Sequence, residues 1–267
     1  MKKYLSFFRI RFTTGLQYRA AALAGAATQF VWGMMTILLY EAFYASDPQA
    51  AGMTFSELVD YMWLRQAFLA LFAIWYLDPE VVNTLQDGMI SYELARPVDL
   101  YGMWYVKGVS LRISRTVLRC MPILIIAFLL PEPYRMHLPK DLLTVSAFLL
   151  STLLATGVIV AFLMLLYIMN IYTISAAGLR IIIVTVVDFL TGGIVPLPMM
   201  PDAVQSVMNV LPFAAMQNMP LRIYSGNIAG ADVWFGLMFQ AFWLAAIIIC
   251  GKLMMRKALR HIVVQGG

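Results

Sequence analysis

The sequence predicts an all-α membrane protein with six transmembrane helices and both termini in the cytoplasm. Three observations predict this fold class: the composition, the lengths of the apolar stretches, and the placement of lysine and arginine. Of the 267 residues, 62% are hydrophobic and only 12% are charged, whereas soluble domains carry roughly 25% charged residues. A globular protein of this size could not bury that much apolar surface in one core, so the lipid bilayer is the better solvent for it.

The transmembrane helices are predicted from apolar stretches, because one crossing needs about 20 mostly apolar residues. Residues 142–179 hold no charge and would be too long for a single crossing at about 1.5 Å per residue. We therefore predict a fourth helix that ends near Tyr167, a turn through 170–178, and a fifth helix that carries Asp188. In chain order the predicted helices are 20–40 (running on toward 44), 55–77, 100–130, 142–167, 181–195 and 233–251.

The positively charged residues predict the orientation, because cytoplasmic loops are enriched in lysine and arginine. With the N-terminus inside, only Arg135, Lys140 and Arg222 fall outside, and Arg65 lies within a predicted helix. The inside segments then hold Lys2, Lys3, Arg9, Arg11, Arg19, Arg96, Lys107, Arg112, Arg115, Arg119, Arg180, Lys252, Arg256, Lys257 and Arg260. This imbalance predicts that both termini are cytoplasmic.

Two segments flank these helices within what we predict to be one transmembrane domain over residues 1–267. Residues 1–19 are amphipathic and basic, which favours a helix lying in the cytoplasmic interface; the alternative is a frayed basic tail. Residues 196–232 contain five prolines, at positions 196, 198, 201, 212 and 220, yet they are too apolar for a solvated loop. We expect two short outer or re-entrant helices there, one opening at Asp202 and one running from Phe213 toward Met219. An ordinary structured outer loop is the alternative.

The loop at residues 78–99 is predicted to be a structured cytoplasmic element. Asp78 is a helix N-cap followed by proline, and Gly88 is a typical helix end. Pro97 ends a second short turn, and Asp99 caps the third transmembrane helix. Such a compact element favours a docking site for another protein, while the alternative is a plain, well-capped connection.

Other chemistry is not indicated by the sequence. There is no GxxxxGK[ST] motif for a nucleotide phosphate. Cys120 and Cys250, like His137 and His261, are isolated from one another in the sequence, so no metal site is predicted. We expect this chain to bind no cofactor of its own, to lie in the lipid bilayer, and to have no nucleic-acid partner.

Several charges fall inside predicted transmembrane helices, where ionisable residues are costly and are functional candidates. Arg65 and Asp188 lie at similar depths, so they are predicted to form an ion pair, to line a substrate cavity, or to be solvated independently. Arg112, Arg115 and Arg119 recur at helical spacing and share one face. They either reach toward lipid headgroups or form a basic opening suited to anionic or lipid-like cargo.

Three stretches carry a resemblance to a known family. The loop DGMISYELARPVDLYGMWY (87–105) resembles the first cytoplasmic loop of type-2 ABC exporter permeases, in particular a bacterial branch whose loop ends in Arg-Pro-Val. The segment GGIVPLPMMPDAVQSVMNVLPFAAMQNMPLRIYSG (192–226) and the end ALRHIVVQGG (258–267) are similar to that branch as well.

The resemblance implies how such a protein works. It implies an N-terminal elbow helix, six crossings, two short outer helices, and a location in the bacterial cytoplasmic (inner) membrane. It also implies a dimer with a second permease, identical or dissimilar, each resting on a separate ATPase subunit that holds ATP and Mg²⁺. Residues 86–98 would be the element that couples to this ATPase. Its polar contacts would be Asp87, Glu93 and Arg96, and its apolar contacts Met89, Ile90 and Tyr92.

Two other classes of function were weighed against an exporter. An ion-coupled secondary transporter would use Asp188 as its ion site, but such transporters carry internal repeats, and the first three predicted helices show none convincing against the last three. An intramembrane enzyme would need clustered catalytic side chains, and Asp188 is the lone acid at the predicted bilayer centre.

Overall fold

A computed structural model describes residues 2–17, 19–46, 52–172 and 176–260. Within these residues the chain is helical and contains no β-strand, which confirms an all-α fold. Three of the described helices are long and apolar enough by themselves to cross a membrane, with apolar spans at Ala22–Ser46, Leu142–Tyr172 and Ala231–Leu259. Residues 261–267, which complete the basic C-terminal motif, lie outside the described residues.

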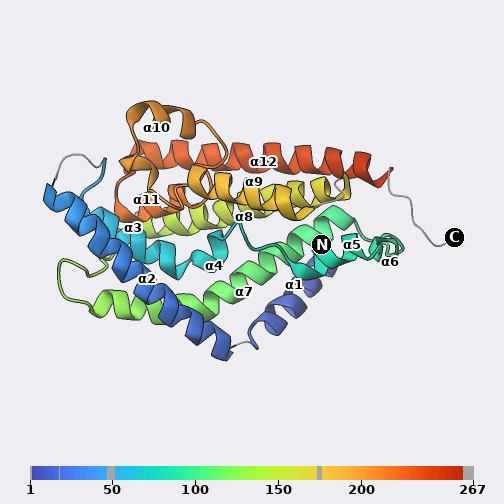
Figure 1. The fold of residues 1–267 in the computed structure, drawn as a ribbon, viewed down its shortest axis with the longest axis horizontal. Helices are drawn as coiled ribbons and strands as arrows, with labels where there is room; N and C mark the ends of the chain where they lie inside the picture. The colour runs from blue at the N-terminus through green and yellow to red at the C-terminus, as the bar shows by residue number, and fades with distance from the viewer. Residues whose placement is uncertain (1, 18, 47–51, 173–175, 261–267) are drawn as a thin grey trace.

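The helices are arranged along one long axis (Figure 1). The short helices α5 and α6, the N-terminal end of α1 and the C-terminal end of α12 lie at one end, and α10 and α11 lie toward the other. The bounds are α1 Lys2–Gly15, α2 Arg19–Ser46, α3 Phe55–Ala67, α4 Leu69–Phe72, α5 Pro79–Gln86, α6 Ile90–Leu94, α7 Leu100–Leu129, α8 Leu142–Tyr172, α9 Ala176–Leu190, the 3-10 turn Leu197–Met199, α10 Asp202–Met208, α11 Asn218–Ser225 and α12 Ala231–Leu259.

Helix α8 is the centre of the core. Much of its surface is buried, and Ala155, Val158, Ile159 and Met164 have no exposed surface. It packs along α12 and α11, while α1 and α2 pack against α7. This arrangement places α7 between the N-terminal helices and the core.

The N-terminal segment and the third apolar stretch follow the prediction closely. Helix α1 is formed and docked on α7, which excludes a frayed tail for residues 2–15. Helix α7 begins directly after Asp99, whose Oδ2 accepts a hydrogen bond from the Gly102 backbone N–H at 2.7 Å, and it continues to Leu129. A carboxylate at this position satisfies a donor that the first helical turn leaves free.

The second apolar stretch is not one continuous helix, which corrects the prediction for residues 55–77. Helix α3 ends at Ala67, α4 is a single turn, and residues 73–78 are not helical. Non-helical backbone at membrane depth requires partners for its carbonyl groups. Two of these carbonyl groups, those of Leu71 at the end of α4 and Tyr76 after it, accept hydrogen bonds from Arg112 on α7, as described below.

The long uncharged stretch contains less turn than expected. Helix α8 continues past Tyr167 to Tyr172, and α9 already begins at Ala176, so the predicted turn through 170–178 was too long. Burial explains the continuation, because Ile168 packs into the core with no exposed surface. Residues 173–175, between the two helices, lie outside the described residues.

The proline-rich segment contains two short helices, but only the first lies where it was predicted. Helix α10 covers Asp202–Met208, whereas the second, α11, covers Asn218–Ser225 instead of residues 213–219. Residues 211–216 form successive tight turns, and Pro220 falls in the first turn of α11, where its missing N–H is not needed. Gly226, with φ of 83°, ends this helix in the left-handed conformation.

Candidate functional site

We call residues 78–99 the foot, and the structure confirms how its local sequence shapes it. The Asp78 Oδ1 atom accepts a hydrogen bond from the Glu80 backbone N–H at 2.9 Å, with Pro79 at the first helical position of α5. Gly88 follows α5 with φ of 69°, a backbone conformation that favours glycine. The foot is therefore two short helices joined by defined breaks rather than a slack loop.

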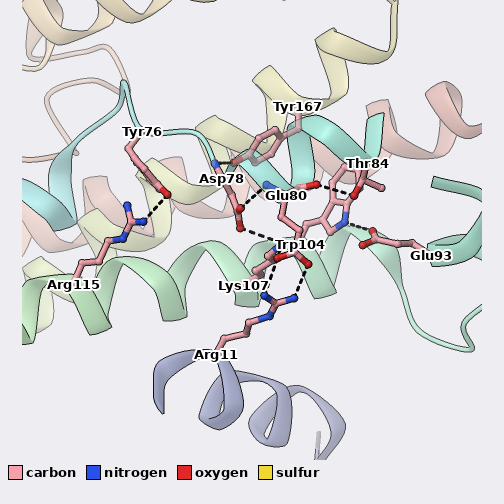
Figure 2. A network of polar contacts seen from close by, with 10 residues as sticks. All are labelled: Arg11, Tyr76, Asp78, Glu80, Thr84, Glu93, Trp104, Lys107, Arg115 and Tyr167. Carbon is pink, nitrogen blue, oxygen red and sulfur yellow. Dashed lines mark hydrogen bonds and ion pairs between the residues drawn. The ribbon is translucent and has the colours of Figure 1, made fainter. Parts of the chain in front are cut away.

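A polar network fastens the foot to three other helices (Figure 2). The Arg11 guanidinium on α1 donates two hydrogen bonds to the Glu80 carboxylate, both at 2.7 Å. The Lys107 ammonium on α7 lies 2.8 Å from Glu80 Oε2 and 3.1 Å from Asp78 Oδ2. The Asp78 backbone N–H donates to Tyr167 Oη on α8 at 2.7 Å. The start of the foot thus contacts α1, α7 and α8 at once.

The charges of this network stabilise one another. The hydrogen bonds from Arg11, followed by that of Lys107, lower the pKa of Glu80 to about 2 against the opposing effect of burial. The same pair raises the pKa of Arg11. The two hydrogen bonds run in parallel, the geometry in which an arginine holds a carboxylate most firmly.

The far end of the foot is held by a second set of contacts. The Trp104 indole N–H on α7 donates to Glu93 Oε2 in α6 (Figure 2). The Lys3 ammonium on α1 donates to the Pro97 carbonyl oxygen at 3.3 Å. Both ends of the foot are therefore tied to α1 and α7.

The predicted contact residues divide into two groups. Asp87 and Arg96 are exposed, as are the apolar side chains of Met89 (50%) and Tyr92 (67%). Ile90, in contrast, is buried against the core, and the Glu93 carboxylate is occupied by Trp104. The outward surface of the foot is accordingly smaller than the sequence predicted.

Sequence reasoning missed several residues of this site. Leu94 adds an exposed apolar side chain to the outward surface. From the sequence, Arg11 and Lys107 indicate only the orientation of the chain in the membrane, and Glu80 indicates only the start of a helix. The spacing of Arg11 from Glu80 in the sequence, 69 residues, gave no signal of their contact.

The three arginines of α7 have different surroundings although they share one side of the helix. Arg112 is buried and donates to the backbone carbonyl oxygens of Leu71 at 3.0 Å and Tyr76 at 3.1 Å. Arg115 stacks on the Tyr76 ring, 3.9 Å from its centroid, and donates to Tyr76 Oη at 2.6 Å (Figure 2). Arg119 lines a cavity together with Arg115. Arg112 therefore supports the broken helix and does not line that cavity.

Arg65 and Asp188 both line a second cavity. This space of about 670 Å³ lies between α2, the α3–α4 break and the end of α9, and Gln29 and Trp32 also line it. Among the described residues no ion pair joins Arg65 to Asp188. The buried Arg65 Nε and Gln29 Oε1 atoms have no hydrogen-bond partner in the described part of the chain.

The fold and the foot define a class: an all-helical membrane protein that presents a rigid, exposed element at one end. A comparison with protein families then names it. The model of the ABC-2 family transporter protein matches residues 30–266, nearly the whole chain, so this chain belongs to that family. It is a permease, the membrane component of an ABC transporter, and family members of this kind lack a nucleotide-binding domain. The resemblance seen in the sequence is thereby confirmed. A comparison with curated proteins gives no match.

Proposed function

We propose that this chain is the permease subunit of an ABC exporter in the cytoplasmic membrane of a bacterium. It would pair with a second permease, a copy of itself or a dissimilar chain, and would be driven by separate ATPase subunits that bind ATP and Mg²⁺. The observation that carries this proposal is the foot, which exposes the apolar side chains of Met89, Tyr92 and Leu94 at one end of the molecule (Figure 1).

Six crossings with both termini inside account for the arrangement of the helices. The crossings would be α2, the α3–α4 pair with its extension, α7, α8, α9 and α12. An even number of crossings returns the chain to its starting side. In support, the N-terminal end of α1 and the C-terminal end of α12 lie at the same end of the molecule as the foot (Figure 1). The excess of lysine and arginine in these segments favours that end as cytoplasmic.

The foot has the composition of a protein-binding surface. Met89, Tyr92 and Leu94 expose apolar surface, and Asp87 and Arg96 flank them with charge. An apolar centre with a polar rim is typical of interfaces between proteins. We infer that this surface sits against an ATPase subunit and that ATP-driven closure displaces the foot. Its connections to α1 and α7 would pass the displacement to the crossings.

The proposal is tested by capturing the partner in intact cells. A photo-crosslinking amino acid replaces Tyr92 in the full-length chain, and the crosslinked protein is identified by mass spectrometry. We expect a cytoplasmic protein that carries a GxxxxGK[ST] motif. The same probe at Leu138, an exposed apolar residue at the opposite end of the molecule, is the matched control and should not capture this protein.

A functional variant completes the test. Replacing both Met89 and Tyr92 with serine should leave the protein inserted but lower its copurification with the ATPase by about tenfold or more, since few apolar anchors carry most of an interface's affinity. Equal copurification of the variant and the wild type, or Tyr92 crosslinks to lipid alone, would contradict the proposed coupling.

A further inference from the structure

A second basic feature lies behind the foot, in a cavity of about 390 Å³ between α1, the start of α2 and α7. The half next to the foot is lined by Arg11, Glu80 and Lys107, which already bind one another. The other half is lined by Arg115, Arg119 and Ala22. We call this second half the arginine groove.

The cations of the arginine groove form no ion pair within the part of the chain that the structure describes. Arg115 and Arg119 are one helical turn apart on α7 and so face the same way. Arg115 binds the phenol of Tyr76, and among the described residues no carboxylate forms an ion pair with either arginine. The nearby acids, Asp78 and Glu80, are occupied by Lys107 and Arg11.

The position of these arginines along α7 makes it costly that neither forms an ion pair among the described residues. Arg115 lies 14 residues and Arg119 lies 10 residues before Leu129, the last residue of α7. At 1.5 Å per residue they are about 21 Å and about 15 Å from the outer end of a helix that crosses roughly 30 Å of hydrocarbon. A cation at that depth is costly unless it is paired or solvated.

Helix α2 presents two small residues, Gly25 and Ala22, to Arg119 and to the groove. A Cβ atom at Gly25 would lie 3.1 Å from Arg119 Cζ, so the guanidinium rests directly against the α2 backbone. Ala22, one turn earlier on α2, also lines the groove and is a small side chain. A larger residue at Ala22 would occupy the groove in front of the arginines, and a larger residue at Gly25 would displace the Arg119 guanidinium.

We propose that the arginine groove binds the phosphate group of an anionic amphiphile from the inner leaflet, with Arg115 and Arg119 as its ligands. Guanidinium groups match the geometry of phosphate oxygens with paired hydrogen bonds. The depth of the groove suits a lipid headgroup drawn inward rather than a phosphate dissolved in the cytoplasm. The inference rests on the proposed function only in placing α7 across the membrane with the foot inside.

The test measures lipid binding by the purified full-length chain. Protein is reconstituted in nanodiscs of phosphatidylcholine with or without phosphatidylglycerol, and the lipids retained after detergent exchange are counted by native mass spectrometry. We expect R115Q/R119Q to lower phosphatidylglycerol retention by about tenfold or more, because two charged hydrogen-bonding groups are lost. R9Q, which removes an exposed cation of α1 outside the groove, should retain the lipid as the wild type does.

A variant on the opposite helix guards against misfolding of the arginine variant. G25L keeps both charges but displaces the Arg119 guanidinium from its place against α2, and it should also lower retention of phosphatidylglycerol. Equal retention by wild type, R115Q/R119Q and G25L would overturn the proposal. So would displacement of the lipid by millimolar inorganic phosphate, because the groove would then bind free phosphate. No ATPase takes part in this measurement, so its failure would leave the proposed coupling untouched, and a failed crosslink at Tyr92 would leave lipid binding untouched.

Discussion

The Arg112 guanidinium of α7 donates a hydrogen bond to the backbone carbonyl oxygen of Leu71, at 3.0 Å, where the second apolar stretch stops being helical. A second hydrogen bond, at 3.1 Å, reaches the carbonyl oxygen of Tyr76, which lies in the non-helical segment 73–78. The end of a helix leaves carbonyl groups without partners, and lipid offers none. Arg112 therefore takes the place of the missing helical hydrogen bonds.

Removing this side chain should destabilise the protein. Arg112→Met leaves the carbonyl groups of Leu71 and Tyr76 without a charged donor, at about 1–3 kcal/mol each, so we expect a loss of about 2–6 kcal/mol. Thermal unfolding of the purified protein in detergent, followed by fluorescence-detected size exclusion, measures the effect. Lys252→Met, which removes an exposed cation of α12, is the control and should unfold as the wild type does. An unchanged unfolding temperature for Arg112→Met would show that water satisfies the carbonyl groups.

The Arg11–Glu80 pair predicts a dependence of stability on pH. The pKa of Glu80 falls from 4.5 to about 2 in the folded protein. Because the folded pKa is the lower one, this contribution is present above about pH 4.5 and is lost as the pH falls toward 2. Glu80→Gln should lower the unfolding temperature at pH 7 by about 2–4 °C, after allowance for the half-exposed carboxylate.

The difference between Glu80→Gln and the wild type should shrink as the pH falls below 4.5. The unfolding temperatures of both proteins are measured between pH 7 and pH 3. Asp87→Asn is the control, because Asp87 is an exposed carboxylate of the same foot that forms no ion pair among the described residues. A pH-independent difference for Glu80→Gln would contradict the assignment of the charge.

Local rules were sufficient to predict much of this fold. The caps at Asp78 and Asp99 and the break at Gly88 place the foot and the start of α7 to within a residue or two. Such signals work because a helix end is decided by a few neighbouring residues. The family could be predicted in the same way, because three short motifs in a fixed order carry it.

The predictions that were wrong concern features that depend on partners distant in sequence. Nothing around residues 67–73 predicts a broken helix, because the side chain that makes the break possible, Arg112, lies 41 residues beyond Leu71. Likewise, the residues of the foot gave no sign that Glu93 would be taken by Trp104 or that Ile90 would turn inward. Exposure and pairing are properties of the packed molecule. The position of the foot could therefore be predicted from the sequence, but the side chains on its outward surface could not.

The family of this chain leads us to expect that ATP drives transport, and the cavity lined by Arg65 and Asp188 offers a test. Both residues line this cavity, and among the described residues no ion pair joins them. Both charges are therefore candidates for contact with a ligand. In an ABC exporter, Asp188→Asn and Arg65→Gln should lower cargo transport by about tenfold or more if each loses one charged contact. Their unfolding temperatures should change by only a few degrees.

The measurement is efflux from cells under two treatments. Depleting ATP should stop efflux by the wild type, whereas a protonophore applied at constant ATP should not. If Asp188 were the ion site of a secondary transporter, the outcomes of the two treatments would be reversed. Restoration of transport by exchanging the two charges, Arg65→Asp with Asp188→Arg, would instead favour a structural pair over two separate ligand contacts.

The close approach of α1 to α7 predicts a steric coupling between Gly15 and Ser114. A Cβ atom at Gly15 would lie 2.2 Å from Ser114 Oγ and 2.8 Å from Ser114 Cβ, distances that force one helix to move. Gly15→Ala should therefore destabilise the protein by about 1–3 kcal/mol, as overpacking does. Adding Ser114→Gly removes both clashing atoms and should recover most of that loss, apart from about 1 kcal/mol for glycine within a helix.

Gly178→Ala, at a helical glycine with open space around it, should be neutral or slightly stabilising. Failure of Ser114→Gly to rescue Gly15→Ala in thermal unfolding would mean that α1 does not dock on α7 at this point. The route from the foot through α1 to the crossings would then lose its support.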